Sequence, residues 1–271
     1  EPVAGDSTVL LWISYVVVAI TVLVLLSGKS IERVLERLSW MMVFFIFSFL
    51  IVANVLFVPL EVWIRTATGF LTPQPLPVDI DIMLLAVFAA TAGSGGLGNL
   101  AISNLSRDKG LGMGAWMGSF GGVLASDHAE LETIGRVFRV SADNLRRWSV
   151  WWKYSVLDQT VLWGLGCVLG MFLNVNLAVS IVPTGTQLPG YSAGAFQAHY
   201  MAEHLWHGFW ALCLINGFWI LFSTQLGNMD VLTRIVADIC WSGWPRLQKM
   251  ASSRLYARLL LGFTVLGIIV L

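Results

Sequence analysis

The residues best suited to binding an ion lie in a glycine-rich stretch inside a long apolar segment. Gly93, Ser94, Gly95 and Gly96 are followed closely by Asn99, near the middle of that segment. Each glycine costs a helix about 1 kcal/mol relative to alanine, so a continuous helix is unfavourable here. Transporters use such breaks to bind ions, because unwound backbone at membrane depth must line a cavity or be buried. We predict a broken helix carrying half of a metal site; a small-residue packing face is the alternative.

A second polar group lies within a later apolar segment. Gln225 and Asn228 are three residues apart, which places both on one side of a helix, and Asp230 follows directly. Polar groups inside a membrane span are costly and usually face the interior of the bundle. We predict that these residues add to the metal half-site, with interhelical hydrogen bonding as the alternative. For Asp230 we favour an ion pair with Arg234, four residues further on.

Histidines gather near the start of the same segment. His199, Glu203, His204 and His207 have spacings of three and four residues, which can bring two or three ligands to one helix face. Glu203, His204 and His207 are therefore candidates for a proton relay or a metal-collecting outer vestibule. Histidine side chains that reach water at the membrane interface are the favoured alternative.

The composition sets the class of protein that must position these residues. Of 271 residues, 57% are hydrophobic and only 12% are charged, and the mean hydropathy is +0.76. This excludes a soluble globular enzyme and indicates an all-α polytopic membrane protein in a lipid bilayer. The 16 basic and 16 acidic residues balance, so no nucleic-acid partner is implied. No catalytic motif or cofactor motif is present, and we expect no enzymatic activity.

Apolar runs predict six transmembrane helices, with the third broken at the glycine-rich stretch. External loops, including an ordinary loop at 183–203, should join them on one side. We take residues 1–271 as a single transmembrane domain. The last run is shorter than a bilayer requires and the chain starts with Glu1, so we expect an incomplete segment of a longer chain. The predicted spans are 9–27, 38–58, 82–106, 154–182, 205–229 (possibly to 239), and one that starts near 255.

The distribution of Lys and Arg orients these spans. Fifteen of the 16 lie on one side of the membrane, and only Arg65 lies on the other. The positive-inside rule makes loops 28–37, 107–153 and 246–254 cytoplasmic, with the N-terminus outside. In the connection 107–153 we predict a short amphipathic helix over 127–140. The aromatic residues that follow are predicted to form an interfacial belt at the mouth of the fourth span: Trp148, Trp151, Trp152 and Tyr154.

Three stretches resemble an Nramp-type divalent metal transporter of a divergent bacterial branch, and the resemblance covers about residues 9 to 246. GKSIERVLE at 28–36 resembles the loop between the family's fourth and fifth helices. GSGGLGNLAISN at 93–104, followed by RDKG, resembles its broken sixth helix and the exit from it. QLGNMD at 225–230 resembles the polar turn of its eighth helix.

The resemblance implies a LeuT-like bundle in which the six spans correspond to family helices four to nine, and a location in a bacterial inner membrane. The orientation from the charges agrees with that numbering. The family's Met-Pro-His motif is replaced here by Gly96, Leu97 and Gly98. Without the methionine thioether the ligands are oxygens, which admits magnesium beside manganese and iron.

Two functions remain open from the sequence. The first is a secondary transporter of divalent metal ions, of the manganese and iron class or of magnesium, coupled to protons. The second is a non-transporting structural subunit of a larger membrane complex, which keeps a transporter-like fold and binds other membrane subunits.

Overall fold

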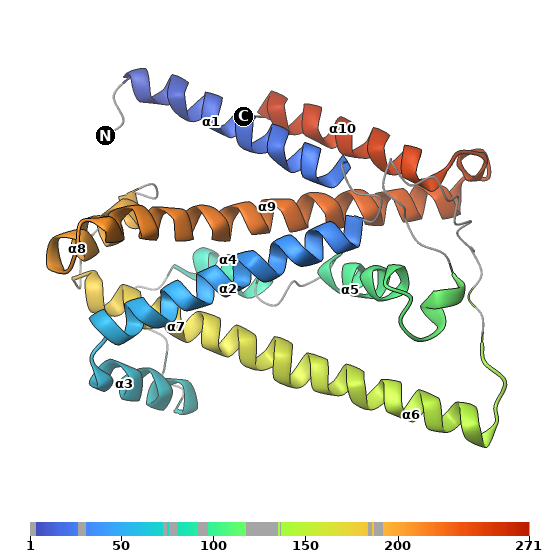
Figure 1. Ribbon diagram of the computed structural model, residues 1–271, viewed down its shortest axis with the longest axis horizontal. Helices are drawn as coiled ribbons and strands as arrows, with labels where there is room; N and C mark the ends of the chain where they lie inside the picture. The colour runs from blue at the N-terminus through green and yellow to red at the C-terminus, as the bar shows by residue number, and fades with distance from the viewer. Residues whose placement is uncertain are drawn as a thin grey trace. The chain divides into compact units, whose positions relative to one another are not determined.

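The described part of the chain is built from helices and contains no β-strand (Figure 1). The computed structural model describes residues 4–26, 31–72, 75, 81–91, 97–117, 135, 137–183, 186 and 192–270. Among these residues, five segments are long and apolar enough to cross a membrane. The prediction of an all-α, multi-pass membrane protein is therefore confirmed at this level. The α-helices are α1 (Ala4–Leu26), α2 (Ile31–Phe57), α3 (Leu60–Leu71), α4 (Ile82–Thr91), α5 (Leu97–Asp108), α6 (Ala142–Leu157), α7 (Gly166–Ile181), α8 (Ser192–His204), α9 (Gly208–Gly243) and α10 (Ser252–Val270).

Four of the six predicted spans coincide with candidate spans of the structure. The last two differ in length, because α9 continues to Gly243 and α10 begins at Ser252. The 36 residues of α9 measure about 54 Å at 1.5 Å per residue, against about 30 Å for the hydrocarbon core of a bilayer. α9 is therefore about 24 Å longer than the hydrocarbon is thick, which is more than two fifths of its length. The four matching candidate spans are Thr8–Leu26, Leu35–Phe57, Gly208–Gly243 and Ser252–Val270.

The third predicted span corresponds to α4 and α5. The first of these helices ends at Thr91 and the second begins at Leu97. Residues 92–96, which include Gly93, Ser94, Gly95 and Gly96, lie outside the described residues. The predicted helix break and its half-site therefore stay predictions.

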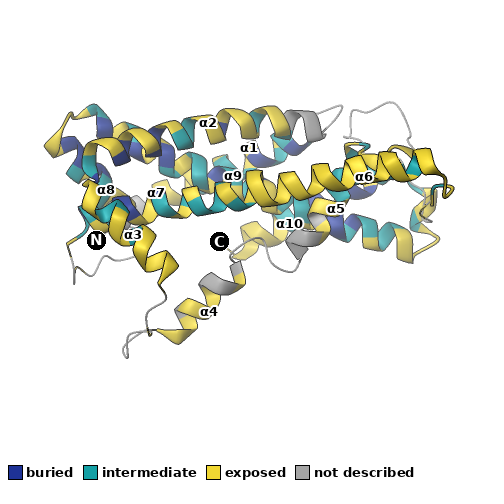
Figure 2. Cartoon of the chain, turned by 90° about the horizontal axis from the view of Figure 1, so that it is seen from below, coloured by how far each residue is buried: buried dark blue, intermediate teal, exposed yellow. Residues whose placement is uncertain are grey.

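The helix that contains the fourth predicted span begins earlier than the span. The helix begins at Ala142 as α6, continues through a π-helical segment, η3 (Asp158–Leu165), and ends as α7 at Ile181. A span needs about 20 apolar residues, and we therefore placed its start at residue 154, after the polar residues that precede it. α6 includes Leu145, Arg146, Arg147 and Lys153, which favour helix with or without a membrane, and it extends the helix before the predicted span. The predicted aromatic belt lies inside this helix, which is exposed along its length (Figure 2).

Two of the predicted external loops contain helices. The loop at 183–203 was predicted to be an ordinary external loop, and the structure forms α8 over its second half. Likewise, α3 lies between the second and third predicted spans. In the connection 107–153, residues 118–134 lie outside the described residues, and residues 137–140, the end of the predicted amphipathic helix, are not helical.

The chain divides into two compact units. Unit 1 comprises residues 1–39, 94–149 and 222–271, and unit 2 comprises residues 40–93 and 150–221. Since the division passes through α2, α6 and α9, these three helices contribute to both units.

Unit 2 has an apolar core to which α2, α7, α8 and the start of α9 contribute. A polar side chain, Asn54, is buried beside it, and its Nδ2 donates to the carbonyl oxygens of Leu50 at 2.8 Å and Leu173 at 3.0 Å. The second bond crosses from α2 to α7, and it fixes the position of one helix along the axis of the other. The buried core residues are Phe49, Leu50, Ala53, Val58, Leu173, Leu177, Ile181, Ala198, Met201, Phe209 and Cys213.

In unit 1, a glycine-dependent turn ends α5 and folds the chain back against it. Gly110 and Gly112 have φ values of 69° and 57°, in the left-handed region that side chains with a Cβ rarely adopt. The following turn of 3-10 helix, η2 (Gly112–Trp116), then lies against the end of α5. Gly114 is so close that a Cβ there would lie 2.8 Å from the Arg107 Cα. The turn thereby fixes the backbone of Arg107.

We expect Gly114→Ala to destabilise the protein by about 1–3 kcal/mol, because the added methyl group overlaps backbone that cannot move cheaply. Thermal unfolding of the detergent-solubilised protein measures this loss. Gly262→Ala in α10 is the matched control, since nothing lies within 4 Å of a Cβ there and alanine favours helix. Equal melting temperatures for the two variants would contradict the close approach.

Candidate functional site

Charged side chains meet at the end of α5 and along the second half of α9. Asp230, Arg234 and Asp238 follow one another at intervals of four residues, so they form a stripe on one side of α9. Arg107 and Asp108 are the last two residues of α5. All five belong to unit 1. We call them, together with Tyr256 of α10, the ionic cluster.

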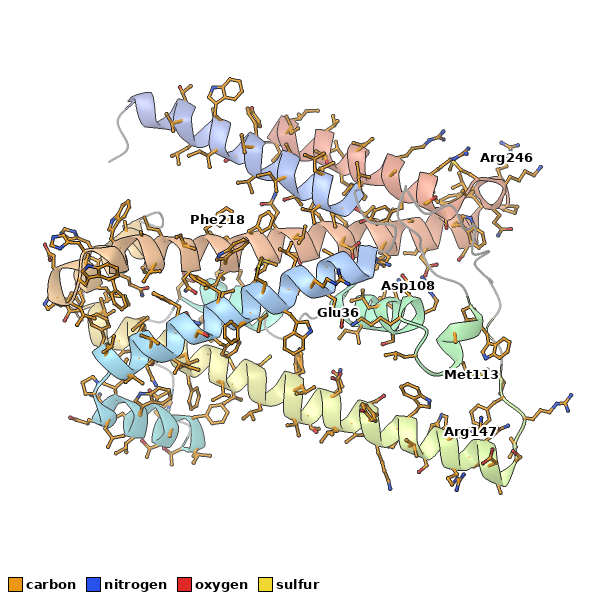
Figure 3. All side chains as sticks on the ribbon, in the orientation of Figure 1. Glu36, Asp108, Met113, Arg147, Phe218 and Arg246 are labelled. Carbon is orange, nitrogen blue, oxygen red and sulfur yellow. The ribbon has the colours of Figure 1, made fainter. Side chains whose placement is uncertain are left out.

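Arg234 is the centre of the ionic cluster. Its Nη2 donates to both carboxylate oxygens of Asp230, at 3.1 and 3.2 Å, and its Nη1 donates to Oδ2 of Asp108. Asp108 is labelled at the end of α5 in Figure 3. The hydroxyl of Tyr256 donates to Oδ1 of Asp230 at 2.8 Å. One guanidinium thus joins α5 to α9, and Asp230 joins α9 to α10. The ion pair between Asp230 and Arg234 that the sequence favoured is confirmed.

Arg107 makes a second ionic link between α5 and α9. Its Nε lies 3.1 Å from Oδ1 of Asp108, and its Nη1 lies 3.0 Å from Oδ2 of Asp238. Asp108 therefore receives one guanidinium on each of its oxygens. Beyond the cluster, Lys109 Nζ lies 3.6 Å from Glu36 Oε1, which joins α5 to α2 by a half-exposed ion pair.

The ionic cluster is buried, so breaking one of its ion pairs costs much more free energy than it would at the surface. The side chains of Asp108 and Arg234 are 0% and 1% exposed. Burial raises the pKa of the Asp108 carboxyl above its ordinary value, and the guanidiniums of Arg234 and Arg107 act in the opposite direction. The three carboxylates of the cluster are occupied by guanidinium or hydroxyl groups. Within the described residues, no group of three or more His, Cys, Asp or Glu side chains is placed to hold a metal ion.

The structure locates part of the predicted metal half-site. Asn99 lies in the first turn of α5, and its side chain is outside the described part. On α9, Gln225 is half-buried and Asn228 is exposed, whereas Asp230 is buried in the ionic cluster. The structure thus engages Asp230 in ion pairing and leaves the metal-binding role of the two amides a prediction.

The predicted outer group of histidines is divided between two segments. Glu203 and His204 end α8, whereas His207 lies in the turn before α9, so the spacing within one helix does not apply. Glu203 Oε1 lies 3.0 Å from His199 Nε2, and both side chains are exposed. His204 Nδ1 lies 2.8 Å from the carbonyl oxygen of Tyr200, on whose ring it stacks. A proton relay through these residues stays a prediction.

Sequence reasoning missed four members of the ionic cluster: Arg107, Asp108, Asp238 and Tyr256. We counted Arg107 as a loop charge that orients the membrane and as the start of the RDKG stretch, not as a partner for α9. A signal was present, because Asp230, Arg234 and Asp238 repeat at the spacing of one helix face, and such a stripe of alternating charge requires partners.

The comparisons with known proteins give no relative: no family model, no curated protein and no solved structure matches this chain.

We expect Arg234→Ala to destabilise the protein by about 3–5 kcal/mol, because two buried carboxylates lose their shared counter-charge. Tyr256→Phe removes the hydrogen bond to Asp230 and should cost about 1–3 kcal/mol. Thermal unfolding in detergent compares the two variants.

The pH dependence of that loss provides a second readout. Without Arg234, the pKa of Asp108 rises further, so the folded state binds more protons than the unfolded state. Stability of Arg234→Ala should therefore increase as the pH falls from about 8 to about 5, relative to the unsubstituted protein. A loss as small as that of Tyr256→Phe, at every pH, would show that Arg234 is not the centre of the cluster.

Proposed function

We propose that the protein is a secondary transporter of divalent metal ions, of the manganese and iron class or of magnesium, coupled to protons. The observation that carries the proposal is the alignment of α5 with α9. The ion pair between Asp108 and Arg234 sets this alignment, and the two helices run in the same direction (Figure 1).

The alignment supports a common depth for two predicted metal ligands. Asn99 lies nine residues before Asp108, and Gln225 lies nine residues before Arg234. At about 1.5 Å per residue, both lie about 13 Å from the ion pair along their helices. An ion that loses its hydration shell near the middle of a membrane needs several oxygens at one level, which such an arrangement provides.

The chemistry of the available ligands favours a hard divalent cation as the substrate. Gln225 and Asn228 offer amide oxygens, which suit magnesium and manganese better than softer metals. Both side chains keep some exposed surface and so remain reachable. The glycine stretch before Asn99 adds backbone carbonyls to this set if its helix is broken, as the sequence predicts.

We expect Gln225→Ala and Asn228→Ala each to reduce uptake of Mn²⁺ into proteoliposomes by about tenfold or more, which corresponds to about 1.4 kcal/mol. Uptake is measured in vesicles that hold the full-length protein, normalised to folded protein. Asn174→Ala is the matched control. This exposed asparagine of α7 bonds only to the Gly170 carbonyl of its own helix in the described contacts, at 2.8 Å.

Loss of uptake in all three variants would indicate damage to the fold rather than to a site. Unchanged uptake in both Gln225→Ala and Asn228→Ala would reject these ligands. Absence of uptake by the unsubstituted protein would favour the second candidate, a non-transporting structural subunit of a larger membrane complex.

A further inference from the structure

The short helix α3 has three distinct sides. At 100° per residue, Leu60, Ile64, Ala67 and Leu71 fall within one narrow stripe, and all four are exposed. We call them the α3 stripe. Charged and polar residues occupy the next side, and the third side faces α7. The stripe is therefore an apolar surface that the described residues of unit 2 leave uncovered.

The third side fixes the direction of α3 relative to α7. Thr66 Oγ1 donates to Asn176 Oδ1 at 2.5 Å, and the rings of Phe70 and Phe172 meet edge to face with their centroids 5.4 Å apart. Phe70 follows Thr66 by four residues on α3, whereas its partner Phe172 precedes Asn176 by four residues on α7. The two helices are antiparallel, and α3 descends alongside α7.

The depth of α3 follows from the end of α2. Asn54 of α2 bonds to Leu173 of α7, so Phe57, where the α2 span ends, lies about level with Asn176. Two residues, Val58 and an extended Pro59, carry the chain at most about 7 Å further out before α3 begins. Since Thr66 is already back at the level of Asn176, the last turn of α3 lies about 6 Å below the end of the α2 span.

The distribution of charge along α3 matches this descent. Glu61 and Arg65 lie in its first half, on the same side and four residues apart, and their charges balance. From Thr66 to the end of the helix at Leu71, the sequence contains no charged residue. An amphipathic helix at a membrane surface buries its apolar side about 5–10 Å into the boundary between headgroups and acyl chains.

We infer that α3 dips into the outer leaflet and that the α3 stripe is covered by lipid acyl chains. The end of α2, just before α3 in the chain, also exposes apolar residues, among them Val55 and Leu56, at 77% and 48% exposure. Because the two charges of α3 cancel, the helix should show no preference for anionic headgroups. The helix thus anchors the outer end of α7 to the bilayer surface, independently of any transport function.

Depth-dependent fluorescence quenching tests this inference. Single cysteines at Ala67 and Leu71 carry a fluorophore in the full-length protein, in vesicles of zwitterionic lipid with nitroxide-labelled acyl chains. Thr68 and Glu61 are the matched control positions, on the polar side of the same helix. The signal of the equally treated protein with native cysteines only is subtracted.

We expect lipid nitroxides to quench the fluorophores at Ala67 and Leu71 at least about twofold more strongly than those at Thr68 and Glu61. Adding anionic lipid should leave that ratio unchanged. Stronger quenching by aqueous iodide at Ala67 and Leu71 than at the controls would place the stripe in water and overturn the inference. Protection of these two positions from both quenchers, with or without cross-links between copies, would mean that protein covers the stripe and would equally overturn it.

Discussion

The burial of one guanidinium, that of Arg234, determines how unit 1 is assembled. Transfer of an ion out of water costs several kcal/mol even after the surroundings relax, so a buried guanidinium needs carboxylates and well-directed hydrogen bonds. On its own helix, Asp230 and Asp238 both lie four residues from Arg234, but Asp238 pairs with Arg107. Arg234 therefore pairs with Asp230 and with Asp108, which α5 brings to it. That requirement fixes where α5 ends, and the glycine turn at Gly110 and Gly112 follows because the chain must reverse directly after this contact.

Unit 2 joins its helices with neutral groups instead. Asn54 bonds to two carbonyl oxygens, and Asn176 accepts a hydrogen bond from Thr66. Such bonds contribute about 0.6 kcal/mol on average in membrane proteins, far less than the penalty for breaking a buried ion pair. Their value lies in alignment, because each bond links residues on different helices. The two units therefore use polar groups differently. Ion pairs join α5 to α9, and a tyrosine hydroxyl on a paired carboxylate adds α10, whereas amide groups set the levels of α2, α3 and α7.

Hydropathy predicted the class of protein and most of the spans, because uninterrupted apolar runs are a direct consequence of the bilayer. It could not predict α3 or α8. These helices are short and carry polar residues, and α3 becomes recognisable only once α7 is in place beside Thr66 and Phe70. The fourth predicted span starts after its helix for the opposite reason, since a bilayer length was applied to a helix that continues beyond the bilayer.

The ionic cluster was only half predicted, for a physical reason. The Asp230 and Arg234 pair is local, at i,i+4, and can be read from one helix. Asp108 lies 126 residues from Arg234, and nothing local distinguishes it from an ordinary charge at a helix end. The glycine stretch at 92–96 belongs to a third case. Its composition predicts that a helix is costly, but composition does not specify which backbone groups an unwound segment would present.

The charge of the cluster bears on the proposed cation site. Three carboxylates face two guanidiniums, so the fully ionised cluster carries one excess negative charge. At about 13 Å and an effective dielectric constant of about 20, this charge lowers the energy of a divalent cation by about 2–3 kcal/mol. The Asp108 carboxyl is the group whose pKa burial raises. A proton on Asp108 removes the excess charge and the attraction with it, so the protonation of the cluster and occupancy at the level of Gln225 oppose each other, as linkage requires.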